Sequence, residues 1–160
     1  MAFGSTLMVH GFLLNNQLTD FSFNPTKNGK LVANSVAAGK RPRSSMSPFM
    51  IFNENNHLIM LIGSPGGSRI INYVAKTILA VLEWDLDIQE AINLPHFVNR
   101  NGATDLEINT SIVNLKTNLE KKGHKVNIRD LNSGLHGIVI KYNKLYGGAD
   151  PRRLGKVLAK

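Results

Sequence analysis

Two adjacent glycines stand where a strand-like run of residues gives way to a helix-like run. Gly66 and Gly67 follow the apolar run 57–63 and precede residues 70–84, whose apolar side chains recur at helical spacing. Such a turn leaves backbone N–H groups uncrowded, and the helix dipole adds positive potential, so the turn can stabilise a developing negative oxygen. The pair alone also fits an ordinary tight turn. It is not a P-loop, because the Lys-Ser/Thr ending of that motif is missing. We expect Ser68 to cap the helix.

Two polar clusters precede this turn in the chain. Ser44 and Ser45 follow two arginines, and hydroxyl and guanidinium groups together suit a carboxylate or a phosphate. Gln17 and Asp20 lie in an earlier polar stretch and could hold an ammonium group. Local composition alone favours a solvated loop for the first cluster and a capped turn for the second.

Several other chemistries are excluded or disfavoured by residue type. The chain has no cysteine, which excludes a disulfide framework, a thiol nucleophile and every cysteine-based metal site. Its five histidines have no histidine partner three or four residues away and no clustered carboxylates, so no metal site is predicted. No segment has the pattern of a nucleophile elbow. We therefore expect neither a metal nor a cofactor.

The chain carries a formal net charge of +8, which attracts anions in general. Its basic residues do not line one helix, and its aromatic residues form no run typical of RNA-binding motifs, so we expect no nucleic-acid partner. A nucleic-acid or membrane-surface role would depend on charge alone and would show steep salt dependence. No stretch approaches the roughly 18 apolar residues that a membrane span requires.

The length and the order of elements bound the fold that must position these groups. A chain of 160 residues with 42% hydrophobic residues matches one globular domain, and no linker divides it. The pattern predicts a hairpin from 48–52 and 57–63, helices over 70–84, 87–93 and 112–122, and strands over 106–108, 126–128, 135–142 and 145–147. Strands, then helices, then strands favour a layered α/β or α+β fold.

Five segments together resemble a known family. Segments 11–22, 39–48, 63–71, 93–97 and 146–153 resemble, in order and spacing, the small subunit of gamma-glutamyltranspeptidase (glutathione hydrolase) across essentially the whole chain. The resemblance implies an α+β fold, namely a partial αββα sandwich of the N-terminal nucleophile hydrolases. Residues 1–160 would then be a single domain, the C-terminal part of such a small subunit.

The resemblance also implies an activity and a role for each polar group. Family members are precursors that cut themselves into a large and a small subunit. The new N-terminal threonine attacks the gamma-glutamyl amide of glutathione, and water, amino acids or peptides accept the acyl group. By this resemblance Gly66 and Gly67 form the oxyanion hole, Ser44 and Ser45 bind the donor α-carboxylate, and Gln17 and Asp20 bind its α-amino group. A periplasmic or extracellular location is implied, with the signal on the large subunit.

The start of the chain departs from the family pattern. The family's catalytic threonine lies upstream of the segment that matches residues 3–5, and Thr6 does not match its position. We therefore expect this polypeptide alone to be inactive. Losing the first strands exposes a strand edge and an apolar face, so we expect pairing with the large subunit or self-association. The alternative is a non-catalytic module that binds gamma-glutamyl groups or carboxylates; an in-frame threonine start upstream in the gene would favour truncation instead.

Overall fold

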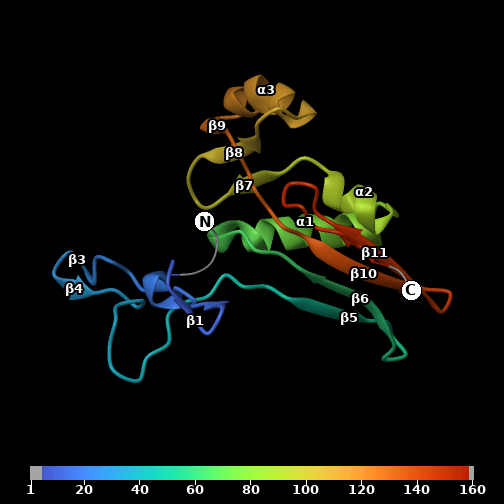
Figure 1. The fold of residues 1–160 in the computed structure, drawn as a ribbon. Coiled ribbons are helices and arrows are strands. Elements are labelled where there is room, and N and C mark those ends of the chain that lie inside the picture. Colours follow the sequence, from blue (N-terminus) through green and yellow to red (C-terminus); the bar gives the residue numbers. More distant parts are fainter. Residues whose placement is uncertain (1–4, 159–160) are drawn as a thin grey trace. The chain divides into compact units, whose positions relative to one another are not determined.

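The computed structural model describes residues 5–158, which fall into two compact units that meet between Ser45 and Met46; each unit is treated by itself (Figure 1). The first unit consists of two short antiparallel hairpins and one 3₁₀ turn. Its elements are β1 (Met8–Val9), β2 (Phe12–Leu13), η1 (Gln17–Asp20), β3 (Thr26–Lys27) and β4 (Lys30–Leu31). Most of its side chains are exposed, and Phe21 and Ser35 are the buried ones among the described residues. Local turns rather than a large core therefore shape this unit.

A four-stranded antiparallel sheet forms the centre of the second unit. Its strands, in spatial order, are β11 (Lys144–Ala149), β10 (His136–Lys141), β6 (Leu58–Gly63) and β5 (Phe49–Phe52). The predicted hairpin is confirmed as β5 and β6. Its turn is closed by Asn53, whose Oδ1 accepts from the backbone N–H groups of Asn55 and His57 at 3.0 and 2.9 Å.

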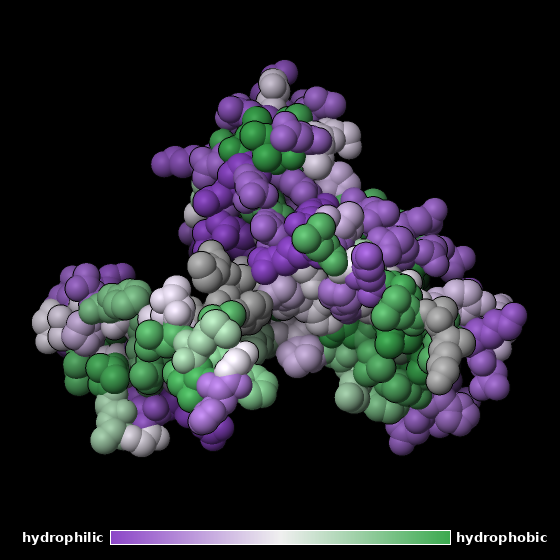
Figure 2. All heavy atoms as spheres, viewed as in Figure 1, coloured by the Kyte–Doolittle hydropathy of each residue, from purple (hydrophilic) through white to green (hydrophobic). Residues whose placement is uncertain are grey.

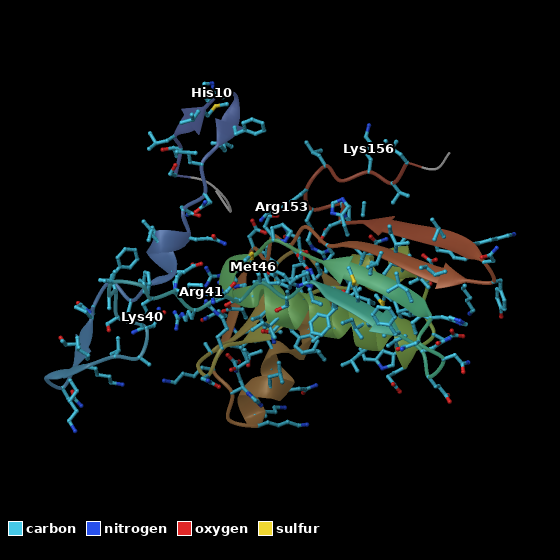
Figure 3. The ribbon with its side chains drawn as sticks, turned by 90° about the horizontal axis from the view of Figure 1, so that it is seen from below. His10, Lys40, Arg41, Met46, Arg153 and Lys156 are labelled. Carbon is cyan, nitrogen blue, oxygen red and sulfur yellow. The ribbon has the colours of Figure 1, made fainter. Side chains whose placement is uncertain are left out.

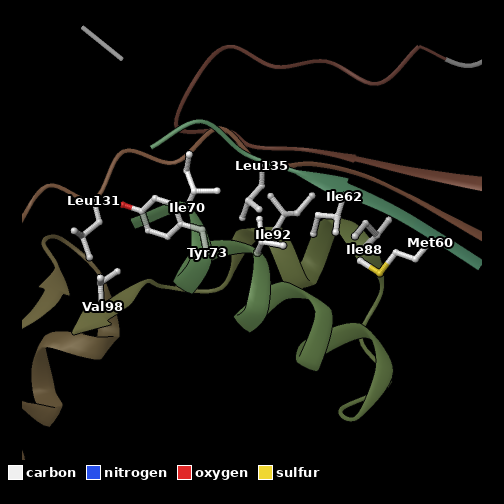
Figure 4. Packing of buried hydrophobic residues seen from close by; sticks show 10 residues of the cluster. Met60, Ile62, Ile70, Tyr73, Ile88, Ile92, Val98, Leu131 and Leu135 are labelled. Atoms are coloured by element: carbon white, nitrogen blue, oxygen red, sulfur yellow. The ribbon is translucent and has the colours of Figure 1, made fainter. Parts of the chain in front are cut away.

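Two helices cover one face of this sheet. They are α1 (Ile70–Leu82) and α2 (Ile88–Asn93), close to the predicted ranges. Asp87 caps α2, because its Oδ1 accepts from Gln89 N–H at 2.7 Å. The buried core, most of which lies between this sheet and the helices, is shown in Figure 4. It comprises Met60, Ile62, Ile70, Tyr73, Val74, Ile88, Ile92, Val98, Leu131 and Leu135.

A second, three-stranded sheet adjoins these helices through α1 and β7. Its strands are β7 (Phe97–Asn99), β8 (Thr104–Glu107) and β9 (Val126–Arg129), with β7–β8 antiparallel and β8–β9 parallel. The chain between β8 and β9 forms η3 (Ser111–Leu115) and α3 (Lys116–Lys121). The helix predicted over 112–122 therefore begins as a 3₁₀ turn. Strand β7 was not predicted, since three residues are too few to show a period.

The opposite face of the four-stranded sheet is apolar and partly open. Met50, Leu61 and Ile138 line a groove there, and Met50 is 67% exposed. The segment after β11 lies along this groove, with Val157 against Gly147 (Figure 3). Figure 2 shows hydrophobic residues gathered over the strands of this sheet. Among residues 5–158, no helix has both the length and the apolar character to cross a bilayer.

A chain of buried polar side chains connects the helices to the end of β11. The Asp150 carboxylate accepts from Ser133 Oγ, and the Ser133 hydroxyl lies 2.6 Å from His96 Nε2. On the other side of the imidazole, Lys76 Nζ lies 3.0 Å from Nδ1. All four residues are buried. This chain joins segments up to 74 positions apart in the sequence, so it can form only when the sheet and helices have packed.

A buried ion pair lies beside this chain. Arg152 donates to the Glu107 carboxylate through Nε and Nη2, at 2.5 and 2.9 Å, and through Nη1 to Asp150 at 3.2 Å. Glu107 also accepts from His96 N–H at 2.6 Å. Bidentate charge-assisted bonds of this kind offset the cost of burying the charges. The pair thereby fastens the segment after β11 to β8.

Burial and neighbouring charges shift the pKa values in this network. Burial, with Lys76 and Arg152 close by, lowers the pKa of His96 to about 2, so its imidazole stays neutral. Burial lowers the pKa of Lys76 to about 7. Burial alone raises the pKa of Asp150, but hydrogen bonds from Ser133 and from the backbone of Arg152 and Leu135 bring it below its ordinary value.

We predict that Asp150→Asn destabilises the protein in a pH-dependent way. Because the folded pKa of Asp150 is lowered, its contribution is present above its ordinary value of 3.8 and is lost as the pH falls below it. Urea unfolding at pH 7 should show a loss of about 3 kcal/mol, and the difference from wild type should shrink toward pH 3. The matched control Asp85→Asn, at a fully exposed side chain, should change stability by less than about 0.5 kcal/mol. A difference that is constant between pH 3 and 7 would contradict the prediction.

Candidate functional site

The turn after β6 is built on two glycines with left-handed or otherwise positive φ. The φ angle is 144° at Gly66 and 59° at Gly67. At Gly66 a Cβ atom would lie 2.7 Å from Cε2 of Tyr73, so a larger residue would collide with the ring. Tyr73 is itself buried in the core, and burial raises the pKa of its phenol to about 12. The backbone of the turn at Gly66 is therefore packed closely against a buried ring.

The backbone amides of this turn have no acceptor within the described part of the second unit. Neither Gly66 N–H nor Gly67 N–H donates a hydrogen bond to another group of residues 46–158. Gly67 is also exposed to solvent. An N–H pair of this kind at the start of a helix can accept an anion or a developing oxyanion.

The loop before β10 holds the turn from its other side. Gly134 N–H donates to Ser64 Oγ at 3.2 Å, and the position of a Cβ on Gly134 would be 2.6 Å from Cγ of Pro65. The next residue, Leu135, donates its N–H to the Asp150 carboxylate at 3.0 Å. The buried network thus positions the loop, and the loop positions the turn.

Ser68 does not cap the helix, contrary to the sequence prediction. A 3₁₀ turn, η2 (Gly67–Arg69), precedes α1, and no side chain caps either element. Ser68 Oγ instead accepts from Nη1 of Arg100 at 2.6 Å. Because η2 begins at Gly67, Ser68 lies within the 3₁₀ turn and not at the position before the helix. Its hydroxyl is directed toward Arg100 in the β7–β8 connection.

Two further arginines, one of them at the end of η2, approach a single aspartate. Arg69 and Arg129 both approach the carboxylate of Asp105, at 3.5 and 3.7 Å, and Asn127 donates to it at 3.2 Å. The Nε atom of Arg69 is buried and has no hydrogen-bond partner in the described residues. Two guanidinium groups therefore share one carboxylate, which leaves the region positive.

In the first unit, a single asparagine connects the two predicted donor-binding groups. Gln17 and Asp20 lie on η1 and are exposed, and Ser44 and Ser45 end the unit. Asn34 Nδ2 donates to the backbone carbonyl of Asp20 at 2.7 Å, and its Oδ1 accepts from Arg43 N–H at 2.9 Å. The carbonyl of Asp20 and the amide beside Ser44 are thereby held by one side chain.

The predicted site residues thus form two groups, each described within its own unit. Gly66 and Gly67 are neighbours on one turn, and Gln17 and Asp20 share η1. That all six residues line one pocket stays a prediction. Sequence reasoning missed Asn34, Arg100 and the buried network. The segment 146–153 did signal the network, since its Asp150 and Arg152 are charged residues next to a strand of small and apolar side chains. No cluster of three potential metal ligands occurs among residues 5–158.

Comparison with known proteins gives a consistent result. The sequence model of the gamma-glutamyltranspeptidase family matches residues 1–160. The glutathione hydrolase proenzyme of Escherichia coli (strain K12) is 36% identical over 157 residues, which cover 93% of this chain and 27% of that protein. Scoloptoxin SSD20 of Scolopendra dehaani is 32% identical over 158 residues, covering 92% of this chain and 78% of that protein. The chain spans about a quarter of the length of the glutathione hydrolase proenzyme.

A solved structure agrees in fold. The acivicin-inhibited gamma-glutamyltranspeptidase superposes with a TM-score of 0.81 at 34% identity, over 95% of this chain and 87% of that chain. This likeness confirms the predicted α+β fold as part of an N-terminal nucleophile hydrolase sandwich. By its sequence over 160 residues and by its fold, the chain belongs to the gamma-glutamyltranspeptidase family.

Proposed function

We propose that this chain is the donor-binding and oxyanion-stabilising part of an enzyme that acts on glutathione and related gamma-glutamyl amides. The gamma-glutamyl group would pass to water in hydrolysis, or to an amino acid or peptide in transfer. The observation that carries the proposal is the pair of acceptor-free amides at Gly66 and Gly67, fixed on a rigid turn of a chain from this family. Residues 1–160 would then be one domain, the C-terminal part of a small subunit.

The turn would act when the amide carbonyl is attacked. A threonine hydroxyl supplied from outside residues 1–160 would form a bond to the carbonyl carbon, and the carbonyl oxygen would take on negative charge. The amides of Gly66 and Gly67 would donate to that oxygen. When the C–N bond breaks, the leaving amine takes the proton that the threonine hydroxyl gave up, and the acyl group stays on the threonine. Water or an amine then repeats the addition and releases the product.

The first unit would hold the free amino-acid end of the donor. That end carries an ammonium and a carboxylate at neutral pH, so it needs an acceptor group and a donor group close together. Asp20 and Gln17 supply acceptors for the ammonium, and Ser44 and Ser45 supply hydroxyl donors for the carboxylate. Asn34 supports this arrangement, because it bonds to the backbone at both Asp20 and Arg43.

The open sheet face supports the proposed partners. Half or more of the surface of Met50 and Phe52 is exposed on or beside this face, and a monomeric protein rarely leaves a large apolar face uncovered. We propose that it is covered by the large subunit of the same precursor or by a second copy of this chain. A periplasmic or extracellular location is proposed on the family resemblance. The alternative is a non-catalytic module that binds gamma-glutamyl groups. In that case the first unit would still bind the donor, but the turn at Gly66 and Gly67 would have no oxyanion to stabilise.

We predict that the 160-residue polypeptide alone does not hydrolyse gamma-glutamyl-p-nitroanilide. The oxyanion turn stabilises a charge that forms only when a nucleophile attacks, and the proposed site assigns that attack to a threonine outside this polypeptide. Release of p-nitroaniline, followed by absorbance, should equal the buffer rate, whereas coexpression with a large subunit and the upstream small-subunit segment of a relative should restore turnover. A burst of aniline from the polypeptide alone would overturn this assignment of the nucleophile.

We predict that Gly66→Ala strongly lowers the rate of the assembled enzyme. The added methyl group collides with Tyr73, so the turn must move and its amides no longer meet the oxyanion; kcat should fall by about 10²-fold or more. Gly102→Ala is the matched control, because its Cβ would meet no atom within 4 Å and its φ is not positive. Steady-state kinetics with the anilide measures both variants. Equal kcat values for Gly66→Ala and wild type would rule out the oxyanion role.

We predict that Asp20→Asn weakens donor binding. Replacing the carboxylate by an amide removes a charge-assisted bond to the donor ammonium, so KM for the anilide should rise by about 10-fold to 100-fold. The control Asp85→Asn removes the same charge from an exposed side chain in the other unit and should leave KM unchanged. If a des-amino donor, which lacks the ammonium, loses as much from Asp20→Asn as the normal donor does, Asp20 has another role.

A further inference from the structure

Arg100 lies on the turn between β7 and β8 and reaches the oxyanion turn. Its Nη1 donates to Ser68 Oγ at 2.6 Å, across 32 residues of sequence. Ser68 directly follows Gly67, whose amide is one of the two proposed oxyanion donors. The guanidinium group is therefore held one residue away from the place where the reacting carbonyl oxygen would bind.

The guanidinium group of Arg100 has no carboxylate partner within the described part of the second unit. Arg100 is exposed, and no Asp or Glu of residues 46–158 forms an ion pair with it. Two more arginines, Arg69 and Arg129, lie nearby and share Asp105. The carboxylates of this region do not neutralise Arg100, so its remaining N–H groups are available to an anion.

The turn that carries Arg100 is rigid. Asn99 Nδ2 donates to Thr104 Oγ1 at 2.9 Å, and Asn99 Oδ1 accepts from Asn101 N–H at 2.9 Å. Asn101 has a φ of 61°, a conformation that asparagine tolerates better than most residues. A preorganised guanidinium group loses less entropy when it binds than one on a mobile loop.

The position and charge of Arg100 suit the other half of the substrate. When a gamma-glutamyl peptide such as glutathione is bound by its carbonyl, the amine side continues as an extended dipeptide that ends in a carboxylate. Two extended residues span about 7 Å. The Arg100 guanidinium group is bonded to Ser68, the residue that follows Gly67, and its planar fork matches a carboxylate.

We propose that Arg100 binds the C-terminal carboxylate of the leaving peptide, and of a peptide acceptor that takes its place in transfer. Arg100 is thereby a specificity-determining residue that favours gamma-glutamyl peptides over gamma-glutamyl amides without a carboxylate. This inference rests on the proposed function, and it adds a recognised group that lies on the opposite side of the scissile bond from the donor zwitterion.

The test compares two substrates that differ only in that carboxylate. Glutathione and its C-terminal amide are assayed with the assembled enzyme as wild type, Arg100→Gln and Arg100→Lys. In wild type, kcat/KM should be about tenfold higher for glutathione than for the amide. Arg100→Gln should bring this ratio close to one, and Arg100→Lys should leave it in between, because a lysine keeps the charge without the fork. Lys122→Gln, which removes a positive charge from the end of α3, is the matched control and should keep the wild-type ratio.

The outcomes separate this inference from the proposed function. A ratio that is unchanged in Arg100→Gln overturns the role of Arg100, even where both substrates are turned over. An equal loss for both substrates means that Arg100 only supports the turn through Ser68, which also overturns the inference. Failure of the assembled wild-type enzyme to act on either substrate overturns the proposed function itself, and this inference falls with it.

Discussion

The bond between the Asp150 carboxylate and the backbone N–H of Leu135 is the contact on which the site turn depends. It fixes the loop before β10 to the end of β11, and Gly134 in that loop holds Ser64 and Pro65. Pro65 leads into Gly66, which is pressed against Tyr73. A buried carboxylate without hydrogen bonds is strongly destabilising, so any movement that breaks the bond to Leu135 is disfavoured. The loop and the turn are therefore held in place.

The same fold separates two kinds of charge. Inside, Glu107 and Arg152 form a bidentate pair, and Lys76, with its pKa lowered to about 7 by burial, contacts a neutral His96. Nearer the surface, the exposed Arg100 donates to the Ser68 hydroxyl and has no carboxylate partner within the described part of the second unit, and Arg69 and Arg129 share the buried carboxylate of Asp105. The basic groups behind the net charge of +8 therefore have two different effects. Those paired with carboxylates stabilise the fold, and those without a carboxylate of their own remain able to bind anions.

Rigidity is distributed in the same way. In the second unit Gly66 is packed against the buried side chains of Tyr73 and Ile70, and the amides of the turn are therefore preorganised, as stabilisation of a transient oxyanion requires. The first unit has few buried residues and is held by side-chain bonds from Asn34 and by short hairpins. Groups that bind a zwitterion can tolerate a less rigid framework, since the ligand itself forms bonds through both its ammonium and its carboxylate.

The sequence by itself determined β5, β6, α1 and α2 in the second unit, and the family. β5 and β6 are continuous apolar runs, and the apolar residues of α1 recur every three to four positions, so the pattern shows these elements directly; Gly66-Gly67 marks the turn between β6 and α1. Only the tertiary structure decided that Ser68 serves Arg100 rather than the helix, that Asn34 joins Asp20 to Arg43, and that Lys76, His96, Ser133 and Asp150 form one chain. The physical reason is that these bonds join residues far apart in sequence. A polar side chain shows its type in the sequence, but its partner is chosen by how the surrounding apolar surfaces pack.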